Sequence, residues 1–188
     1  MKIKAVIYDC VGPLLIKKRG WHPSKTIIEI NTRCGDALND RLFWHEIKKE
    51  FSSKSLNIDD IINKISSGYK KNLLMWQFHK KIKNKYKTGI INNGTFRIFN
   101  KWVNKYNFKR NFDILLNSAE LGIKKPDRKI FKVMCEKLKV KPEECLFIDD
   151  STANTNAAQK AGMNALHYDL NNHARFLNSF NKLEKLSA

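Results

Sequence analysis

The sequence is poor in cysteine and in long apolar runs, and it has only half as many acidic residues as basic ones. Its four cysteines, Cys10, Cys34, Cys135 and Cys145, contain no C-x-x-C pair, which argues against a disulfide framework and against a zinc ribbon. No apolar run approaches the roughly 20 residues that span a bilayer. Residues 1–7 form one short apolar stretch, and an acidic residue follows it closely. This pattern is unlike that of a secretory signal. We therefore expect a soluble, cytoplasmic protein with no membrane partner.

The apolar content is nevertheless high enough for a folded core. The chain has 188 residues, of which 42% are hydrophobic and 11% aromatic, and this length suits one domain or one domain with a small insertion. The formal charge of +18 could attract nucleic acid or small anions. However, the basic residues are spread along the chain, and neither cluster, at residues 17–19 and 80–87, coincides with a nucleic-acid-binding motif. We expect solvated surface lysines and no nucleic acid partner.

Short apolar runs recur along the chain and predict the strands of a buried parallel sheet. The runs at residues 3–9 and 145–149 each end in an aspartate, and further runs occupy residues 88–91, 112–116 and 164–167. Apolar residues at helical spacing separate the later runs from one another. Strands that alternate with helices predict an α/β fold with a Rossmann-like, doubly wound parallel sheet.

The segment after the first predicted strand differs from the rest of the chain. Residues 17–85 contain apolar residues at helical spacing and no convincing strand. We therefore predict a small α-helical domain, residues 17–85, inserted into an α/β core formed by residues 1–16 and 86–188.

Residues that can carry chemistry follow the predicted strands. Ligands of open parallel sheets bind beyond the carboxyl ends of the strands, where we place Asp9, Asn92, Lys125, Asp149 and Asp150. A single acid at a strand end often only caps the next helix, so the set is more informative than any member. Carboxylates that meet at one edge repel each other unless a cation joins them, and oxygen ligands favour Mg²⁺. A facing lysine would neutralise the cluster further.

Four segments of the sequence resemble the motifs of the haloacid dehalogenase-like hydrolase superfamily. They are Asp9-Cys10-Val11-Gly12, Ile90-Ile91-Asn92-Asn93-Gly94, Gly122-Ile123-Lys124-Lys125-Pro126-Asp127 and Phe147-Ile148-Asp149-Asp150-Ser151. The resemblance implies an α/β core with a small helical cap after the first strand, which matches residues 17–85. It also implies a small, soluble, anionic substrate that carries a phosphoryl group.

The resemblance implies a role for each matching residue. The implied catalytic residues, with Asp9 as the nucleophile, are Asp9, Asn92 and Lys125. The implied substrate-binding residues are Asn93, Gly94 and Lys125. The implied Mg²⁺ ligands are Asp9, the backbone carbonyl of Val11, Asp149 and Asp150.

The sequence departs from the superfamily pattern next to the nucleophile. Phosphatases of the superfamily carry a second aspartate two residues after the first, where it protonates the leaving oxygen and activates water, and here that residue is Val11. Such general acid–base help accelerates a reaction roughly 10²–10⁴-fold. Pro13 replaces the usual threonine and has no backbone N–H. The serine or threonine of the second motif is replaced by Asn92, whose amide can still donate a hydrogen bond.

Three interpretations of the function follow from these departures. The first is an atypical or weak hydrolase, or one whose leaving group needs no proton, as in an acyl phosphate. The second is a catalytically inactive protein that binds a phosphorylated ligand or a protein partner. The third is a carbon–halogen hydrolase, since those members also lack the second aspartate, although they usually have an aromatic residue where Val11 stands. Lys17, Lys18 and Arg19 lie close in sequence to Asp9, where the inserted domain begins, and we expect at least one of them to contact an anionic substrate.

Overall fold

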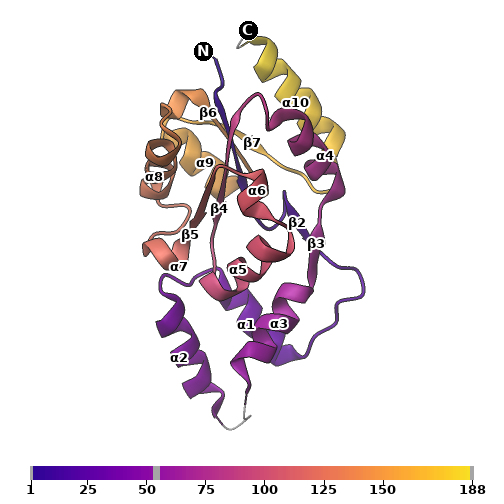
Figure 1. The fold of residues 1–188 in the computed structure, drawn as a ribbon, viewed down its shortest axis with the longest axis vertical. Helices are drawn as coiled ribbons and strands as arrows, with labels where there is room; N and C mark the ends of the chain where they lie inside the picture. The colour runs from indigo at the N-terminus through magenta and orange to yellow at the C-terminus, as the bar shows by residue number, and fades with distance from the viewer. Residues whose placement is uncertain (1, 53–55, 187–188) are drawn as a thin grey trace.

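A five-stranded parallel sheet forms the centre of the molecule (Figure 1). The computed structural model describes residues 2–52 and 56–186. The strands are β1 (Ala5–Asp9), β4 (Lys87–Asn92), β5 (Ile114–Asn117), β6 (Cys145–Asp149) and β7 (Asn164–His167). Their order is β5-β4-β1-β6-β7, and every neighbouring pair is parallel. The chain thus winds outward from β1 in both directions, which confirms the predicted doubly wound α/β fold.

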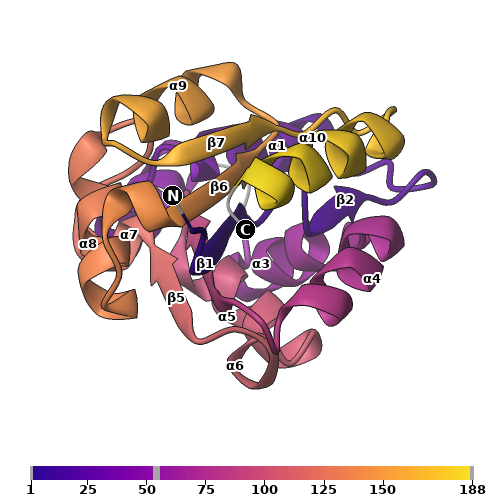
Figure 2. The same cartoon turned by 90° about the horizontal axis from the view of Figure 1, so that it is seen from above.

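Helices cover both faces of this sheet (Figure 2). Successive residues of a strand point to opposite faces. Ala5 and Ile7 accordingly pack with α8 and α9, whereas Val6 and Tyr8 pack with α4, α5 and α10. The covering helices are α4 (Leu73–Ile82), α5 (Phe96–Lys105), α8 (Arg128–Leu138), α9 (Thr152–Lys160) and α10 (His173–Leu186). Because both faces are covered, the strands are apolar throughout, as their sequences indicate.

The segment after β1 forms a helical layer at the end of the molecule opposite the chain termini (Figure 1). Its helices are α1 (Lys25–Cys34), α2 (Asp40–Glu50) and α3 (Ile58–Ser67). An antiparallel pair of strands, β2 (Leu15–Lys17) and β3 (Tyr69–Lys71), joins this layer to the sheet. The prediction that residues 17–85 contain no strand was therefore wrong. Three-residue strands are too short to show the alternation by which a strand is recognised.

Helix α4 packs on the sheet's own helices, although the sequence places it in the inserted domain. The ring of Phe78 lies 4.9 Å from that of Phe176 and 4.7 Å from that of Phe180, both in α10. His79 stacks on Phe112 at 4.2 Å. The division of the chain at residues 16 and 86 stays a prediction.

Short helical segments complete the described chain. They are α6 (Phe108–Asn111), α7 (Ser118–Leu121) and the 3₁₀ helix η2 (Pro142–Glu144). Among the described helices, none has both the length and the apolar character needed to cross a membrane.

Candidate active site

The loop after β1 turns sharply and presses against the end of β6. Leu15 N–H donates to the Cys10 carbonyl at 2.8 Å, and Gly12 N–H donates to the Leu15 carbonyl at 2.7 Å. Gly12 has a φ of +108°, and a Cβ atom built there would lie 2.5 Å from the Asp150 carboxyl group. This close approach requires glycine, and it places the loop and Asp150 side by side.

We expect the substitution Gly12→Ala to displace Asp150 as well as strain the backbone. Gly122 is a matched control, because it also has a positive φ, of 67°, but a Cβ atom there meets nothing within 4 Å. Gly122→Ala should lower the free energy of unfolding by only about 1–2 kcal/mol. Gly12→Ala should lower it further and weaken divalent-cation binding about 10–100-fold, as loss of a ligand-positioning contact does. Denaturant unfolding and calorimetry measure both effects, and equal behaviour of the two variants contradicts the prediction.

Lys125 is held in place by the turn that follows β4. The Asn93 amide group accepts a hydrogen bond from Lys125 N–H at 2.9 Å and donates one to the Lys125 carbonyl at 2.8 Å. The Lys125 side chain is buried, and its Nζ lies 2.5 Å from Asp9 Oδ1 and 2.9 Å from Asp149 Oδ2. Lys124, in contrast, points outward and forms an ion pair with Asp36. Asn93 thus orients the lysine that faces both acids.

The two acids at the end of β6 have different environments. Asp149 is fully buried, and besides Lys125 its carboxylate accepts hydrogen bonds from Asn154 Nδ2 at 3.0 Å and from Ser151 N–H at 2.8 Å. Asp150 is exposed, and its backbone carbonyl accepts a hydrogen bond from His167 Nε2 at 2.9 Å. Asp149 is therefore fixed by its partners, while the Asp150 carboxylate faces the loop at Gly12.

Three carboxylates meet at this point, as the sequence predicts. Asp9, Asp149 and Asp150 each offer an oxygen within 4.8 Å of the others. Burial and, to a smaller extent, the charge of Asp149 raise the pKa of Asp9 to about 7, although Lys125 opposes this shift. Burial and the charge of Asp149 also raise the pKa of Asp150. One ammonium group does not balance three carboxylates, so this set of oxygen donors fits a divalent cation.

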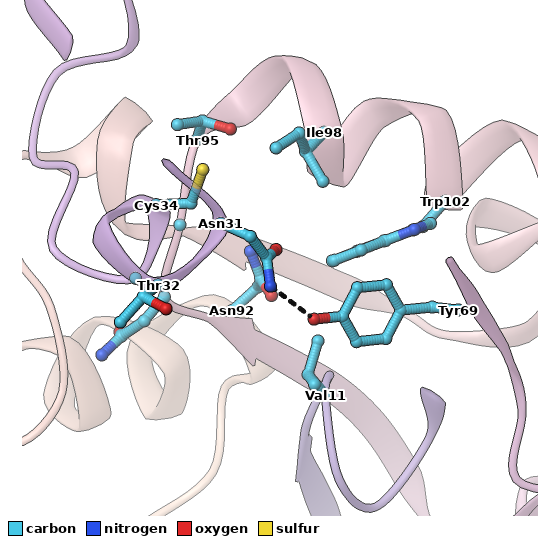
Figure 3. Close-up of a pocket in the computed structure, with 12 residues that line it drawn as sticks. Val11, Asn31, Thr32, Cys34, Tyr69, Asn92, Thr95, Ile98 and Trp102 are labelled. Atoms are coloured by element: carbon cyan, nitrogen blue, oxygen red, sulfur yellow. Dashed lines mark hydrogen bonds between the residues drawn. The ribbon is translucent and has the colours of Figure 1, made fainter. Parts of the chain in front are cut away.

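A cavity of about 180 Å³ lies between the helical layer and the sheet (Figure 3). Val11 and Asn92 line it from the loop after β1 and the end of β4. Asn93 and Gly94 line it as well, so the structure brings the predicted substrate-binding turn to this cavity. The opposite wall comes from α1, β3 and α5. None of Lys17, Lys18 and Arg19 lines it, so the expectation that they contact the substrate finds no support there.

Several residues of the cavity were not predicted. Asn31, Tyr69, Thr95, Ile98 and Trp102 all line it. Only Thr95 could have been found from the sequence, because it follows the predicted turn directly. Asn31 and Tyr69 are 38 positions apart, and Asn31 Nδ2 donates to the Tyr69 hydroxyl oxygen at 3.1 Å. The fold alone brings them together.

Sequence comparison adds a family assignment to this geometry. A family model described as haloacid dehalogenase-like hydrolase matches residues 75–167. Over these residues, just under half of the chain, the sequence matches that family. Its sequence is 39% identical over 54 residues to bifunctional epoxide hydrolase 2 of Rattus norvegicus and 33% identical over 61 residues to acyl-CoA dehydrogenase family member 10 of Mus musculus. These segments cover 29% and 32% of this chain but only 10% and 6% of those proteins.

Solved structures of the haloacid dehalogenase-like superfamily share the fold over nearly the whole chain. One is the wild-type HAD family enzyme bt-2542 from Bacteroides thetaiotaomicron, in complex with magnesium and inorganic phosphate. It has a TM-score of 0.72 and 22% identity, covering 89% of this chain and 95% of that one. The 2-haloacid dehalogenase from Pseudomonas syringae has a TM-score of 0.66 and 18% identity, covering 88% and 86%. A HAD phosphatase from Thermococcus onnurineus has a TM-score of 0.64 and 19% identity, covering 89% and 86%.

Proposed function

We propose that this chain is a Mg²⁺-dependent hydrolase with an Asp9 nucleophile, acting on a small phosphorylated or otherwise activated substrate. One observation carries the proposal: the Asp9 carboxylate lies 2.5 Å from a buried lysine amine and within 4.8 Å of oxygens of Asp149 and Asp150. The similar bt-2542 enzyme, which was solved with magnesium and inorganic phosphate, supports the same class of ligand.

Asp9 and Lys125 have different roles in the proposed reaction. The hydrogen bond from Lys125 fixes the orientation of the Asp9 carboxylate, and the lysine charge favours the ionised form of a group whose pKa burial raises. Attack of a carboxylate oxygen on phosphorus forms an acyl phosphate on Asp9 and breaks the bond to the leaving group. Attack of water on that phosphorus then releases phosphate and restores the carboxylate. In this proposal Lys125 stabilises negative charge on the transferred group throughout.

The acids around Asp9 would hold the metal ion. The donors are Asp9, Asp150 and the backbone carbonyl of Val11, with Asp149 both a further donor and the partner that orients Lys125. A bound Mg²⁺ supplies charge neutralisation at the phosphoryl oxygens.

Val11 makes the proposed hydrolase atypical. Its side chain lines the cavity where the leaving group would lie, and it can neither donate nor accept a proton. Burial raises the pKa of Cys34 to about 12 and also raises the pKa of Tyr69, so neither is an effective acid in neutral solution. A substrate that loses an unprotonated leaving group, such as an acyl phosphate, suits this site.

Val11 also favours two other candidate functions. A site without a general acid could bind a phosphorylated ligand or a protein partner and catalyse nothing. A carbon–halogen hydrolase needs no proton donor, because halide leaves unprotonated, and one similar structure is a 2-haloacid dehalogenase.

A hydrolysis screen separates these three functions. Acetyl phosphate, an alkyl phosphate and chloroacetate are each incubated with the chain, with and without Mg²⁺, and Asp9→Asn serves as the blank. We expect Mg²⁺-dependent release of phosphate from acetyl phosphate, slow release from the alkyl ester, and none with the blank. Equal activity of Asp9→Asn contradicts the proposal. Binding of phosphate without turnover indicates the inactive protein, and release of chloride without Mg²⁺ indicates the dehalogenase.

A further inference from the structure

The cavity next to Val11 has neutral walls in a strongly basic chain. None of its twelve lining residues has a charged side chain, although the chain carries a formal charge of +18. We propose that the group attached to the transferred phosphoryl is small and uncharged, and that the cavity recognises it through a hydroxyl or carbonyl oxygen. This inference rests on the proposed function and names the substrate class of the same site.

The volume of the cavity limits the size of that group. A water molecule occupies about 30 Å³ in the liquid, so about 180 Å³ holds only a few non-hydrogen atoms. Sites for larger organic ligands measure roughly 300–1,000 Å³. A two- or three-carbon group therefore fits inside the cavity, whereas most of a nucleoside would lie outside it.

The neutral walls exclude a second charge on the substrate. A buried charge without an opposite partner is strongly unfavourable. Lys125, the buried lysine of the acidic cluster, is already paired with Asp9 and Asp149. The described lining thus offers no partner to a carboxylate, a second phosphate or an ammonium group on the bound substrate.

Polar side chains in the cavity wall could hydrogen-bond to a ligand oxygen. Thr95 is buried, and its hydroxyl makes no well-formed hydrogen bond with a nitrogen or oxygen of the described residues; the Cys34 thiol is its polar neighbour. The Tyr69 hydroxyl accepts from Asn31 Nδ2, which leaves its own proton available. These groups lie around the same cavity (Figure 3). A ligand hydroxyl or carbonyl there would give the buried Thr95 hydroxyl a stronger partner than a thiol.

The rings in the wall favour a carbon skeleton beside that oxygen. The Trp102 indole N–H already donates to the Ser66 carbonyl at 2.9 Å, so Trp102 offers the cavity only its apolar surface. Its ring lies 5.1 Å from that of Tyr69, and Ile98 completes this side of the cavity.

Phosphonates test the inference because they bind without being hydrolysed. Four compounds of similar size are titrated in Mg²⁺ by calorimetry: ethylphosphonate, 2-hydroxyethylphosphonate, 2-aminoethylphosphonate and phosphonoacetate. We expect the hydroxyethyl compound to bind most tightly, and at least about tenfold more tightly than the two compounds with a second charge. Equal or tighter binding of a charged compound overturns the inference, and so does the absence of binding by all four.

Two variants locate the recognition in the cavity. Thr95→Val conserves the shape and removes no helix cap, because the Thr95 side chain makes no capping hydrogen bond to α5. It should abolish the preference for hydroxyethylphosphonate over ethylphosphonate, and retention of that preference contradicts the role of Thr95. Asn31→Asp adds one negative charge and should shift the preference to aminoethylphosphonate. The proposed function is tested separately, by measuring hydrolysis of acetyl phosphate with the same wild-type preparation. An absence of hydrolysis contradicts the proposed function and not the inference about the cavity.

Discussion

Replacing Lys125 with methionine should lower the free energy of unfolding by about 3–5 kcal/mol at pH 8 without divalent cations, the usual effect of breaking a buried ion pair. The Lys125 ammonium group is the shared partner of Asp9 and Asp149, and all three are buried or nearly so. Its loss leaves the carboxylates of Asp9 and Asp149 facing each other without a cation, with the exposed Asp150 beside them. Denaturant unfolding followed by circular dichroism measures the change.

Lys124→Met is the matched control for this prediction. Lys124 is the preceding residue, but its ion pair with Asp36 is solvent-exposed, and such pairs contribute only roughly 0–1 kcal/mol. The effect of Lys125→Met should also shrink at pH 5, because the pKa of Asp9 is already raised to about 7 by burial and the acid then carries its proton. Equal losses in the two variants, or a loss independent of pH, would contradict this account of the cluster.

Replacing Val11 with aspartate should accelerate hydrolysis of a simple alkyl phosphate by about 10²–10⁴-fold, the usual contribution of a general acid–base group. Val11 lies in the loop after Asp9, and its side chain lines the cavity next to the predicted nucleophile. An aspartate there could protonate the leaving oxygen and then activate water. Acetyl phosphate should gain much less, because its leaving group needs no proton. Steady-state kcat for both substrates measures the difference.

Val11→Asn is the control for the change in shape and polarity. Asparagine has nearly the size of aspartate but cannot exchange a proton at neutral pH. We expect it to leave the slow alkyl ester activity near the wild-type value. If Val11→Asn accelerates hydrolysis of the alkyl phosphate as much as Val11→Asp does, the wild-type site does not lack a general acid. If neither variant accelerates it, the result favours the binding-protein alternative.

The sheet and the acidic cluster could be predicted from the sequence because local patterns determine both. The apolar run at 145–149 coincides with β6, since a strand covered on both faces is apolar along its length. The strand ends then bring Asp9 and Asp149 together, because β1 and β6 are parallel neighbours.

The cavity and the role of Asn93 could not be predicted in the same way. The cavity walls come from α1, β3, the end of β4 and α5, which only the tertiary fold brings together. Asn93 was predicted to bind substrate, and in the structure its side chain holds the backbone of Lys125. A polar residue in a turn can face a ligand or the chain itself, and sequence alone does not distinguish them. A contact between Asn93 and substrate stays a prediction.

A calorimetric Mg²⁺ titration tests the shared cation site most directly. At pH 8 the wild-type chain should bind one Mg²⁺, whereas Asp9→Asn and Asp150→Asn should each lose binding. Asp169→Asn, which removes a carboxylate from a loop outside the cluster, should retain it. Because the cation needs the ionised acid and the pKa of Asp9 is about 7, affinity should fall about tenfold per pH unit below that value. Wild-type affinity in Asp9→Asn or Asp150→Asn, or no binding by the wild-type chain, contradicts the account.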